Sequence, residues 1–176
     1  GAGNDTLLGG EGDDTLMGGD NDDELNGGVG ADLMDGGSGN DTLLGGTFRD
    51  SPSGGAGRDY IEGGKGDDVI DGGESDDLIY GGTVDDTITG GLGDDRMFGG
   101  KGTDTFVFAA MDGQDTISGF DAASETLQIS GYDSDDVTLV EMGDNVLVTF
   151  DGGADSIYLI GTSFDDLSTM NAFDFL

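Results

Sequence analysis

The stretch that decides the fold is Gly9-Gly10-Glu11-Gly12-Asp13-Asp14-Thr15-Leu16-Met17, because its pattern recurs every nine residues along the chain. A Gly-Gly pair opens eleven full units over residues 9–107, and a partial unit at 1–8 precedes them. Every unit has an aspartate at its sixth position. These aspartates are Asp5, Asp14, Asp23, Asp32, Asp41, Asp50, Asp59, Asp68, Asp77, Asp86, Asp95 and Asp104. An ordinary solvated acidic face would not keep such a period.

The eighth position of each unit is apolar, with Pro52 as the exception. It is occupied by Leu7, Leu16, Leu25, Met34, Leu43, Ile61, Ile70, Ile79, Ile88, Met97 and Phe106. From its aspartate to its last residue, a unit alternates as in a short strand. The glycine-rich residues up to and including that aspartate predict a tight turn. Two units then form one coil of a solenoid, in which units i and i+2 stack in parallel around a central apolar column.

Composition excludes several classes of function. Five basic and 39 acidic residues give a net charge of −34, which repels nucleic acid and anionic lipid surfaces. The absence of histidine and cysteine excludes a Ser-His-Asp triad, a Cys-His pair and the usual zinc site. No apolar stretch approaches the roughly 18 residues of a membrane helix. The chain starts at Gly1 without methionine or an apolar signal segment, so we expect it to be the C-terminal part of a longer protein.

The predicted stacking brings the sixth-position aspartates into neighbouring layers, where unneutralised carboxylates would repel one another. A hard divalent cation between successive turns resolves this repulsion, using carboxylate and backbone carbonyl oxygens. Calcium suits such a site better than magnesium, because it tolerates irregular all-oxygen coordination.

The repeats resemble the RTX (repeats-in-toxin) nonapeptide family, whose motif G-G-x-G-x-D-x-U-x binds calcium. The resemblance implies a right-handed parallel β-roll, with about ten calcium ions held between stacked turns. In each site one turn offers its aspartate and the carbonyls of its second and fourth residues. These carbonyls belong to Gly1, Gly3, Gly10, Gly12, Gly28, Gly30, Gly37, Gly39, Gly55, Gly57, Gly64, Gly66, Gly91, Gly93, Gly100 and Gly102. The turn two units later offers its aspartate and the carbonyls of its first and third residues. These belong to Gly18, Asp20, Gly27, Val29, Gly36, Ser38, Gly54, Ala56, Gly72, Glu74, Gly81, Thr83, Gly90, Leu92, Gly99 and Lys101.

Some units depart from this pattern. The fourth-position glycine is replaced by Asn21, Phe48, Ser75 and Val84. Asparagine adopts the left-handed backbone readily, whereas valine and phenylalanine do so reluctantly. The unit 45–53 also places Pro52 in the inward column. We expect one weakened layer inside a continuous roll; the alternative is a hinge between two rolls, 1–44 and 54–107.

The repeat region has a small core for its length, with one inward apolar side chain per unit. It also carries a charge of −20, from 5 basic and 25 acidic residues. We therefore predict that the repeats are disordered without calcium and fold on binding it. Extracellular calcium modules bind at roughly 0.1–1 mM, an affinity that would keep the chain unfolded in a calcium-poor cytosol.

Beyond Val107 the period stops, so the sequence divides into a repeat region, 1–107, and a tail, 108–176. Alternating apolar runs lie at 126–130, 137–141, 145–150 and 156–160, with turns at 131, 142–144 and 151–153. They predict an antiparallel β region, which we interpret as the end cap of an otherwise all-β solenoid. The segment 115–121 resembles the post-repeat segment of the family, in which Asp115 and Asp121 close the last calcium sites.

The chain ends Phe173-Asp174-Phe175-Leu176, which resembles the C-terminal signal read by bacterial type I secretion machinery. We therefore expect a calcium-dependent folding and secretion module of a larger secreted or cell-surface protein. Its partners would be calcium, the secretion machinery and an N-terminal parent domain. The alternative is an extracellular adhesion or polysaccharide-binding surface. No set of catalytic residues is found in this chain, so we do not expect it to be an enzyme. Any enzymatic activity would belong to the parent protein.

Overall fold

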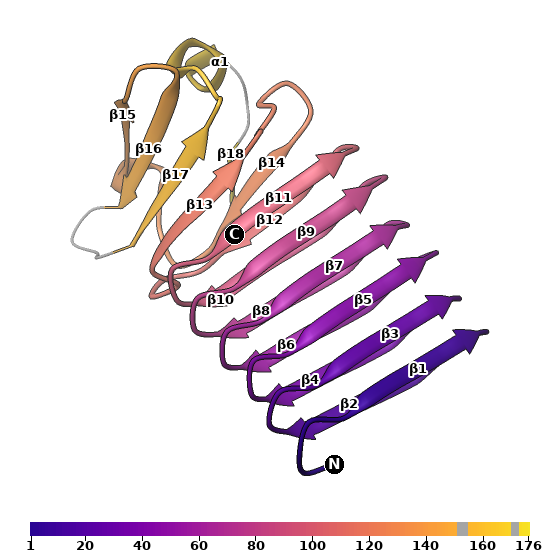
Figure 1. Cartoon of the computed structure of the whole chain (residues 1–176). Coiled ribbons are helices and arrows are strands. Elements are labelled where there is room, and N and C mark those ends of the chain that lie inside the picture. The colour runs from indigo at the N-terminus through magenta and orange to yellow at the C-terminus, as the bar shows by residue number, and fades with distance from the viewer. Residues whose placement is uncertain (151–154, 170–172) are drawn as a thin grey trace.

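The computed structural model describes residues 1–150, 155–169 and 173–176 and is built almost entirely of strands. Two sheets face each other along the molecule (Figure 1). The ten-stranded sheet contains, in spatial order, β1 (Thr6–Glu11), β3 (Glu24–Val29), β5 (Thr42–Thr47), β7 (Tyr60–Lys65), β9 (Leu78–Thr83), β11 (Arg96–Lys101), β13 (Gln114–Ser118), β17 (Ser156–Ile160), β16 (Asn145–Phe150) and β15 (Val137–Glu141). The eight-stranded sheet contains β18 (Phe173–Phe175), β14 (Thr126–Ile129), β12 (Thr105–Phe108), β10 (Thr87–Leu92), β8 (Val69–Glu74), β6 (Ser51–Ala56), β4 (Leu33–Ser38) and β2 (Thr15–Asp20).

The expected stacking of units i and i+2 is confirmed. Within the repeats each strand pairs in parallel with the strand two units away, as Leu25 does with Leu43 and Leu43 with Ile61. The eighth-position side chains lie between the two sheets, and from Leu25 to Phe106 those that are apolar have at most 1% of their surface exposed. The fold is therefore a parallel β-solenoid with one continuous apolar column.

The division of each unit into strand and turn differs from the prediction. Repeat strands such as β2 contain six residues, including the Gly-Gly pair and the residue after it. The turn is reduced to three residues, 21–23 after β2. The Gly-Gly pair continues the parallel ladder although its second residue has a positive φ, as in the Gly28–Gly46 pair. A Cβ atom on Gly28 would collide with the carbonyl oxygen of Gly10, so glycine here permits the close approach of successive coils.

The eroded unit 45–53 does not interrupt the solenoid. β6 pairs with β4 on one side and with β8 on the other. Its pairing with β8 begins only at Ser53, past Pro52, which has no N–H group to donate. In the opposite sheet, β5 and β7 pair along their whole length, from Thr42–Tyr60 to Thr47–Lys65. The parallel ladder is thus continuous through this unit, with a shorter pairing between β6 and β8 than between β6 and β4.

The parallel stack continues into the tail, which the sequence analysis did not predict. β13 pairs with β11 and β14 with β12, both in parallel. The run 126–130 was predicted to be antiparallel, and this prediction is wrong. Residues 110–118 are a further repeat unit, displaced by two residues, in which Ala110 and Met111 replace the glycine pair and Ile117 lies fully buried in the column.

The antiparallel strands expected near the C-terminus are confirmed for β15, β16 and β17. They extend the ten-stranded sheet past β13, and Figure 1 shows them at the end of the stack opposite the N-terminus. A 3-10 turn, η1 (Ser134–Asp136), and a short helix, α1 (Phe164–Thr169), complete this region. The turn predicted at 151–153 lies outside the described residues. Within the described ranges, no helix has the length and apolar character needed to cross a membrane.

All four residues that replace the fourth-position glycine adopt a positive φ. Val84 has the largest value, 87°, and about half of its side chain is exposed. Because this conformation is costly for a β-branched residue and little packing compensates for it, Val84→Gly should stabilise the calcium-bound chain by about 1 kcal/mol. Thermal unfolding at saturating calcium measures this change. A lower melting temperature than that of the wild-type chain would contradict the prediction, and Val69→Gly, in a strand, is the control expected to destabilise.

Candidate metal centre

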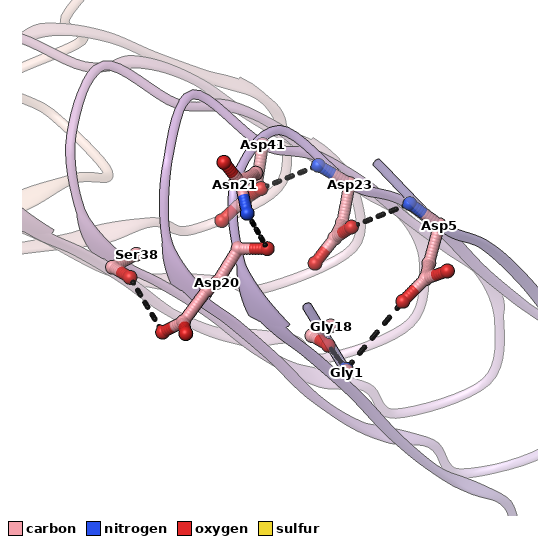
Figure 2. Close-up of polar contacts among 8 residues, drawn as sticks. All are labelled: Gly1, Asp5, Gly18, Asp20, Asn21, Asp23, Ser38 and Asp41. Atoms are coloured by element: carbon pink, nitrogen blue, oxygen red, sulfur yellow. Dashed lines mark hydrogen bonds and ion pairs between the residues drawn. The ribbon is translucent and has the colours of Figure 1, made fainter. Parts of the chain in front are cut away.

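The sixth-position aspartates form a ladder along each edge of the solenoid. From Asp23 to Asp104, the Oδ1 atom of each ladder aspartate accepts a hydrogen bond from the backbone N–H of the aspartate 18 residues earlier. Figure 2 shows this for Asp5, Asp23 and Asp41, with N···O distances of 2.7 Å for both steps. The same bond recurs at every coil up to Asp104 and Asp115. The repeat therefore places carboxylates in vertical register, as the sequence predicted.

In eleven of the ladder aspartates the second carboxylate oxygen has no hydrogen-bond partner among the described residues. From Asp14 to Asp104 the Oδ2 atoms are buried and accept no hydrogen bond from any described group. From Asp23 onward the ladder aspartates are at most 4% exposed. Uncompensated buried acceptors, and ionised ones above all, are costly. An arrangement repeated eleven times along the chain therefore calls for a cation at these atoms.

Glycine at the first position gives this cation its space. A Cβ atom placed on Gly9 would lie 2.7 Å from Asp14 Oδ2 and 2.6 Å from the carbonyl oxygen of Gly27. The orphan carboxylate oxygen and a carbonyl of the next coil thus converge on one point beside the glycine. Both are hard oxygen donors of the kind that calcium takes, so the residues present fit the ion.

Burial makes the unneutralised ladder resist ionisation. The pKa is raised to about 6 for Asp50, Asp59 and Asp95, to about 7 for Asp86 and to about 8 for Asp77 and Asp115. Loss of hydration is the largest cause in each, and neighbouring carboxylates add to it. The backbone N–H bond to Oδ1 works in the opposite direction. The ionised carboxylates of the ladder therefore repel one another unless a cation lies between them.

No cluster of three or more acidic side chains of metal-binding geometry occurs among residues 1–150, 155–169 and 173–176. This agrees with a site in which each turn contributes one aspartate and the other ligands are backbone carbonyls. Basic side chains do not take the cation's place: Arg58 lies 4.0 Å from Asp76, and both are exposed and outside the ladder.

A second ladder, at the fifth position, was missed by the sequence analysis. The Oδ1 atom of Asp22 accepts from the backbone N–H of Asn40 at 2.8 Å, and Asn40 Oδ1 accepts from that of Arg58 at 3.0 Å. These bonds run towards the C-terminus, opposite in direction to the sixth-position ladder. The recurrence of Asp or Asn at the fifth position was the signal that could have found it. This second ladder joins successive turns through hydrogen bonds at exposed positions.

The two tail aspartates occupy different environments. Asp115 continues the ladder, accepting from Asp95 N–H at 3.0 Å, and is 3% exposed. Asp121 is exposed and accepts from Ala123 N–H and the Ser124 hydroxyl. On this edge the residue in register with Asp104 is Glu125, because Thr105 pairs with Thr126. The structure therefore brings Asp115 to the candidate site and leaves Asp121 in a surface turn.

A parallel solenoid with a buried carboxylate ladder at each edge has the architecture expected of a metal-binding repeat protein. Four copies of the RTX calcium-binding nonapeptide repeat match residues 1–34, 17–52, 53–87 and 76–106. The chain belongs to this family, whose repeats bind calcium.

Among solved structures, the crystal structure of the extracellular lipase LipA from Serratia marcescens is similar to this chain, with a TM-score of 0.45 and 20% identity. The match covers 98% of this chain and 40% of the lipase chain. No curated protein matches the chain by sequence.

Proposed function

We propose that this chain is a calcium-dependent folding and type I secretion module of a larger exported bacterial protein. The observation that carries the proposal is the row of buried Oδ2 atoms from Asp14 to Asp104, which accept no hydrogen bond from any residue that the structure describes. A chain with this ladder is poorly suited to fold where calcium is scarce and well suited to fold where calcium is abundant. Export of an unfolded chain followed by folding outside the cell uses that difference.

The residues proposed to hold calcium are the ladder aspartates together with carbonyl oxygens of the glycine-rich turns. Bound calcium supplies positive charge between carboxylates that otherwise repel. Each interior turn faces a turn on both sides, so its aspartate contributes to two successive sites. About ten ions follow from pairing the twelve turns at i and i+2. The chain itself is proposed to be non-catalytic, and any enzyme activity would belong to the parent.

The proposed export signal is Phe173–Leu176. In the folded chain β18 pairs with β14, and the amide of Leu176 donates to the carbonyl of Ile129. The signal is then part of a sheet edge, so we expect the secretion machinery to read it before the chain folds. Calcium-dependent folding would keep the signal available in the cytosol.

Export and folding can be separated experimentally, because Asp174 and Leu176 are both exposed in the folded chain. Asp174→Ser plus Leu176→Ser should reduce type I export at least about tenfold while leaving calcium-dependent folding unchanged. Met142→Ser plus Asp144→Ser, also at exposed positions, is the matched control. The measurement is the fraction of chain in the medium, beside circular dichroism of the purified protein. Wild-type export of the Asp174/Leu176 variant would remove the secretion role.

A polysaccharide-binding surface is the second candidate, favoured by an aromatic row on the outer face of β7, β9 and β11. The ring centroids of Tyr60 and Tyr80 are 5.8 Å apart, and those of Tyr80 and Phe98 are 4.7 Å apart. Cavities of about 520 and 260 Å³ adjoin Tyr60, and the larger is also lined by Arg58 and Arg96. Aromatic walls with a few polar groups are typical of ligand grooves.

If the aromatic row binds glycans, calcium-loaded protein should bind members of a glycan array, and Tyr60→Ser plus Tyr80→Ser should abolish that binding. Val69→Ser, on the opposite sheet, is the control and should bind as the wild-type chain does. Because the tyrosines lie on the surface, the variant should keep its calcium-dependent fold. No glycan bound above background by the wild-type protein would eliminate this candidate.

A further inference from the structure

The coil that follows the last regular repeat lacks the glycine-rich turn of the coils before it. Its turn, residues 120–125, contains no glycine and reads Phe120-Asp121-Ala122-Ala123-Ser124-Glu125. The amide of Thr126 nevertheless donates to the Asp104 carbonyl at 3.0 Å, the bond that every preceding coil makes at this place. Glu125 therefore occupies the ladder position that aspartate occupies in the coils below it.

Asp104, which is in register with Glu125 in the preceding coil, has a buried carboxyl group with no positively charged partner among the described residues. It is 0% exposed, and its Oδ2 atom has no hydrogen-bond partner among the described residues. Glu125 is 6% exposed and lies close enough for each carboxyl to influence the pKa of the other. No lysine or arginine follows Lys101 in the sequence. Two carboxyl groups are thus buried side by side at a place that no basic side chain of the tail can neutralise.

The first carbonyl of this turn has a hydrogen-bond partner of its own, unlike the carbonyl that the earlier coils present beside the ladder. At Gly81, a Cβ atom would meet the carbonyl oxygen of Gly99 at 2.7 Å, showing how the next coil presents a carbonyl. The equivalent carbonyl of the next coil, that of Phe120, accepts the hydroxyl of buried Thr162 at 2.7 Å. Because that carbonyl already accepts a buried hydroxyl, a side-chain oxygen is the better candidate donor at this end of the ladder.

Glu125 is suited to supply that donor, because its side chain is one methylene longer than aspartate. Its Oε2 atom accepts the amide of Asp121 at 2.8 Å, which holds the carboxyl group over the turn. Asp121 is committed elsewhere: its two oxygens accept from Ala123 and Ser124 in the same surface turn.

We propose that Glu125, with Asp104, binds the calcium ion that closes this edge of the roll, and that Asp121 does not bind it. The inference rests on the proposed calcium-dependent folding and assigns the last ion of the stack. Asp104 and Glu125 give this terminal site two carboxylates, the same number that two stacked turns supply to an interior site. Its filling would order β14 on β12 and so complete the end of the column.

The test compares Glu125→Gln, Asp121→Asn and the exposed control Glu141→Gln in the full chain. Glutamine keeps the size and hydrogen-bonding capacity of Glu125 but removes the anionic ligand. We expect Glu125→Gln to bind one calcium ion fewer in equilibrium dialysis and to need about threefold or more calcium to protect residues 105–108 and 126–129 from amide exchange. Asp121→Asn and Glu141→Gln should match the wild-type chain in both measurements.

An unchanged ion count and unchanged protection in Glu125→Gln would overturn the proposal, as would the loss of an ion in Asp121→Asn. If Glu125→Gln does not fold, Glu125→Asp keeps the charge but shortens the reach, and wild-type protection of residues 126–129 in that variant would also overturn it. Failure of the proposed function is a different result, because the wild-type chain would then show no calcium-dependent protection anywhere in β1 to β11.

Discussion

Withdrawal of calcium is expected to convert this chain from a β-solenoid to a disordered coil, and return of calcium is expected to restore the solenoid. The reason lies in the ladder. In every coil from Asp14 to Asp104 a carboxylate oxygen is buried without a hydrogen-bond partner in the described parts of the chain. The whole chain carries a net charge of −34. One apolar side chain per nine residues is a small core to set against that repulsion and the entropy of ordering the chain.

Far-UV circular dichroism during a titration from zero to about 10 mM calcium measures this transition, the upper limit bracketing the affinities of extracellular calcium modules. The transition should be cooperative, because each interior aspartate faces the coils on both sides and neighbouring coils stabilise one another. Magnesium is the control. It requires near-octahedral geometry and keeps its waters, so it should not replace calcium at equal concentration.

A chain that keeps its β signal in chelator would contradict this prediction. Packing and backbone hydrogen bonds would then be sufficient to hold the roll, and the argument for export in an unfolded state would lose its basis. The polysaccharide-binding surface would become the leading candidate, because it needs only a rigid face that presents Tyr60, Tyr80 and Phe98.

The repeat region could be predicted well because one period carries several independent constraints. The aspartate at the sixth position and the apolar residue at the eighth fix both the stacking of units i and i+2 and the inward column. The extent of the strands could not be predicted in the same way. Glycine composition favours turns, yet in the solenoid the Gly-Gly pairs are held in strands by parallel neighbours such as Gly28 and Gly46.

The tail was harder to predict, because alternation of apolar residues does not encode the direction of a strand or its partner. The run 126–130 was predicted to be antiparallel, although it forms β14, which pairs in parallel with β12. The displaced unit 110–118 escaped notice because two inserted residues shift its period and Ala110 and Met111 replace the glycines. Met111 nonetheless has a φ of 81°, in the positive range of the second-position glycines. Glu125 was missed for a related reason, since only the register shows that it stands in for an aspartate.

Acid should partly replace calcium in folding the metal-free chain. The pKa of the ladder carboxyls is raised in the folded state, to about 8 for Asp77 and about 7 for Asp86, with loss of hydration as the first cause. A group whose pKa is higher in the folded than in the unfolded state binds protons preferentially when folded. Its contribution to stability is full below the ordinary value of 3.8 and is lost as pH rises through about 6 to 8. The metal-free chain should therefore show more β structure at pH 5 than at pH 8.

Calcium binding should respond to pH in the opposite sense, since calcium binds ionised carboxylates and competes with protons for them. The calcium concentration at mid-transition should rise as pH falls from 8 to 5. Asp77→Asn separates the two effects: it removes a buried charge but leaves an Oδ1 acceptor for the amide of Asp59. This variant should be more structured than the wild-type chain without metal at pH 8 and should require more calcium to fold fully. Glu74→Gln, at an exposed position, should change neither. If metal-free wild-type chain were less structured at pH 5 than at pH 8, the electrostatic cost assigned to the ladder would be wrong, because protonation would then remove no repulsion that opposes folding.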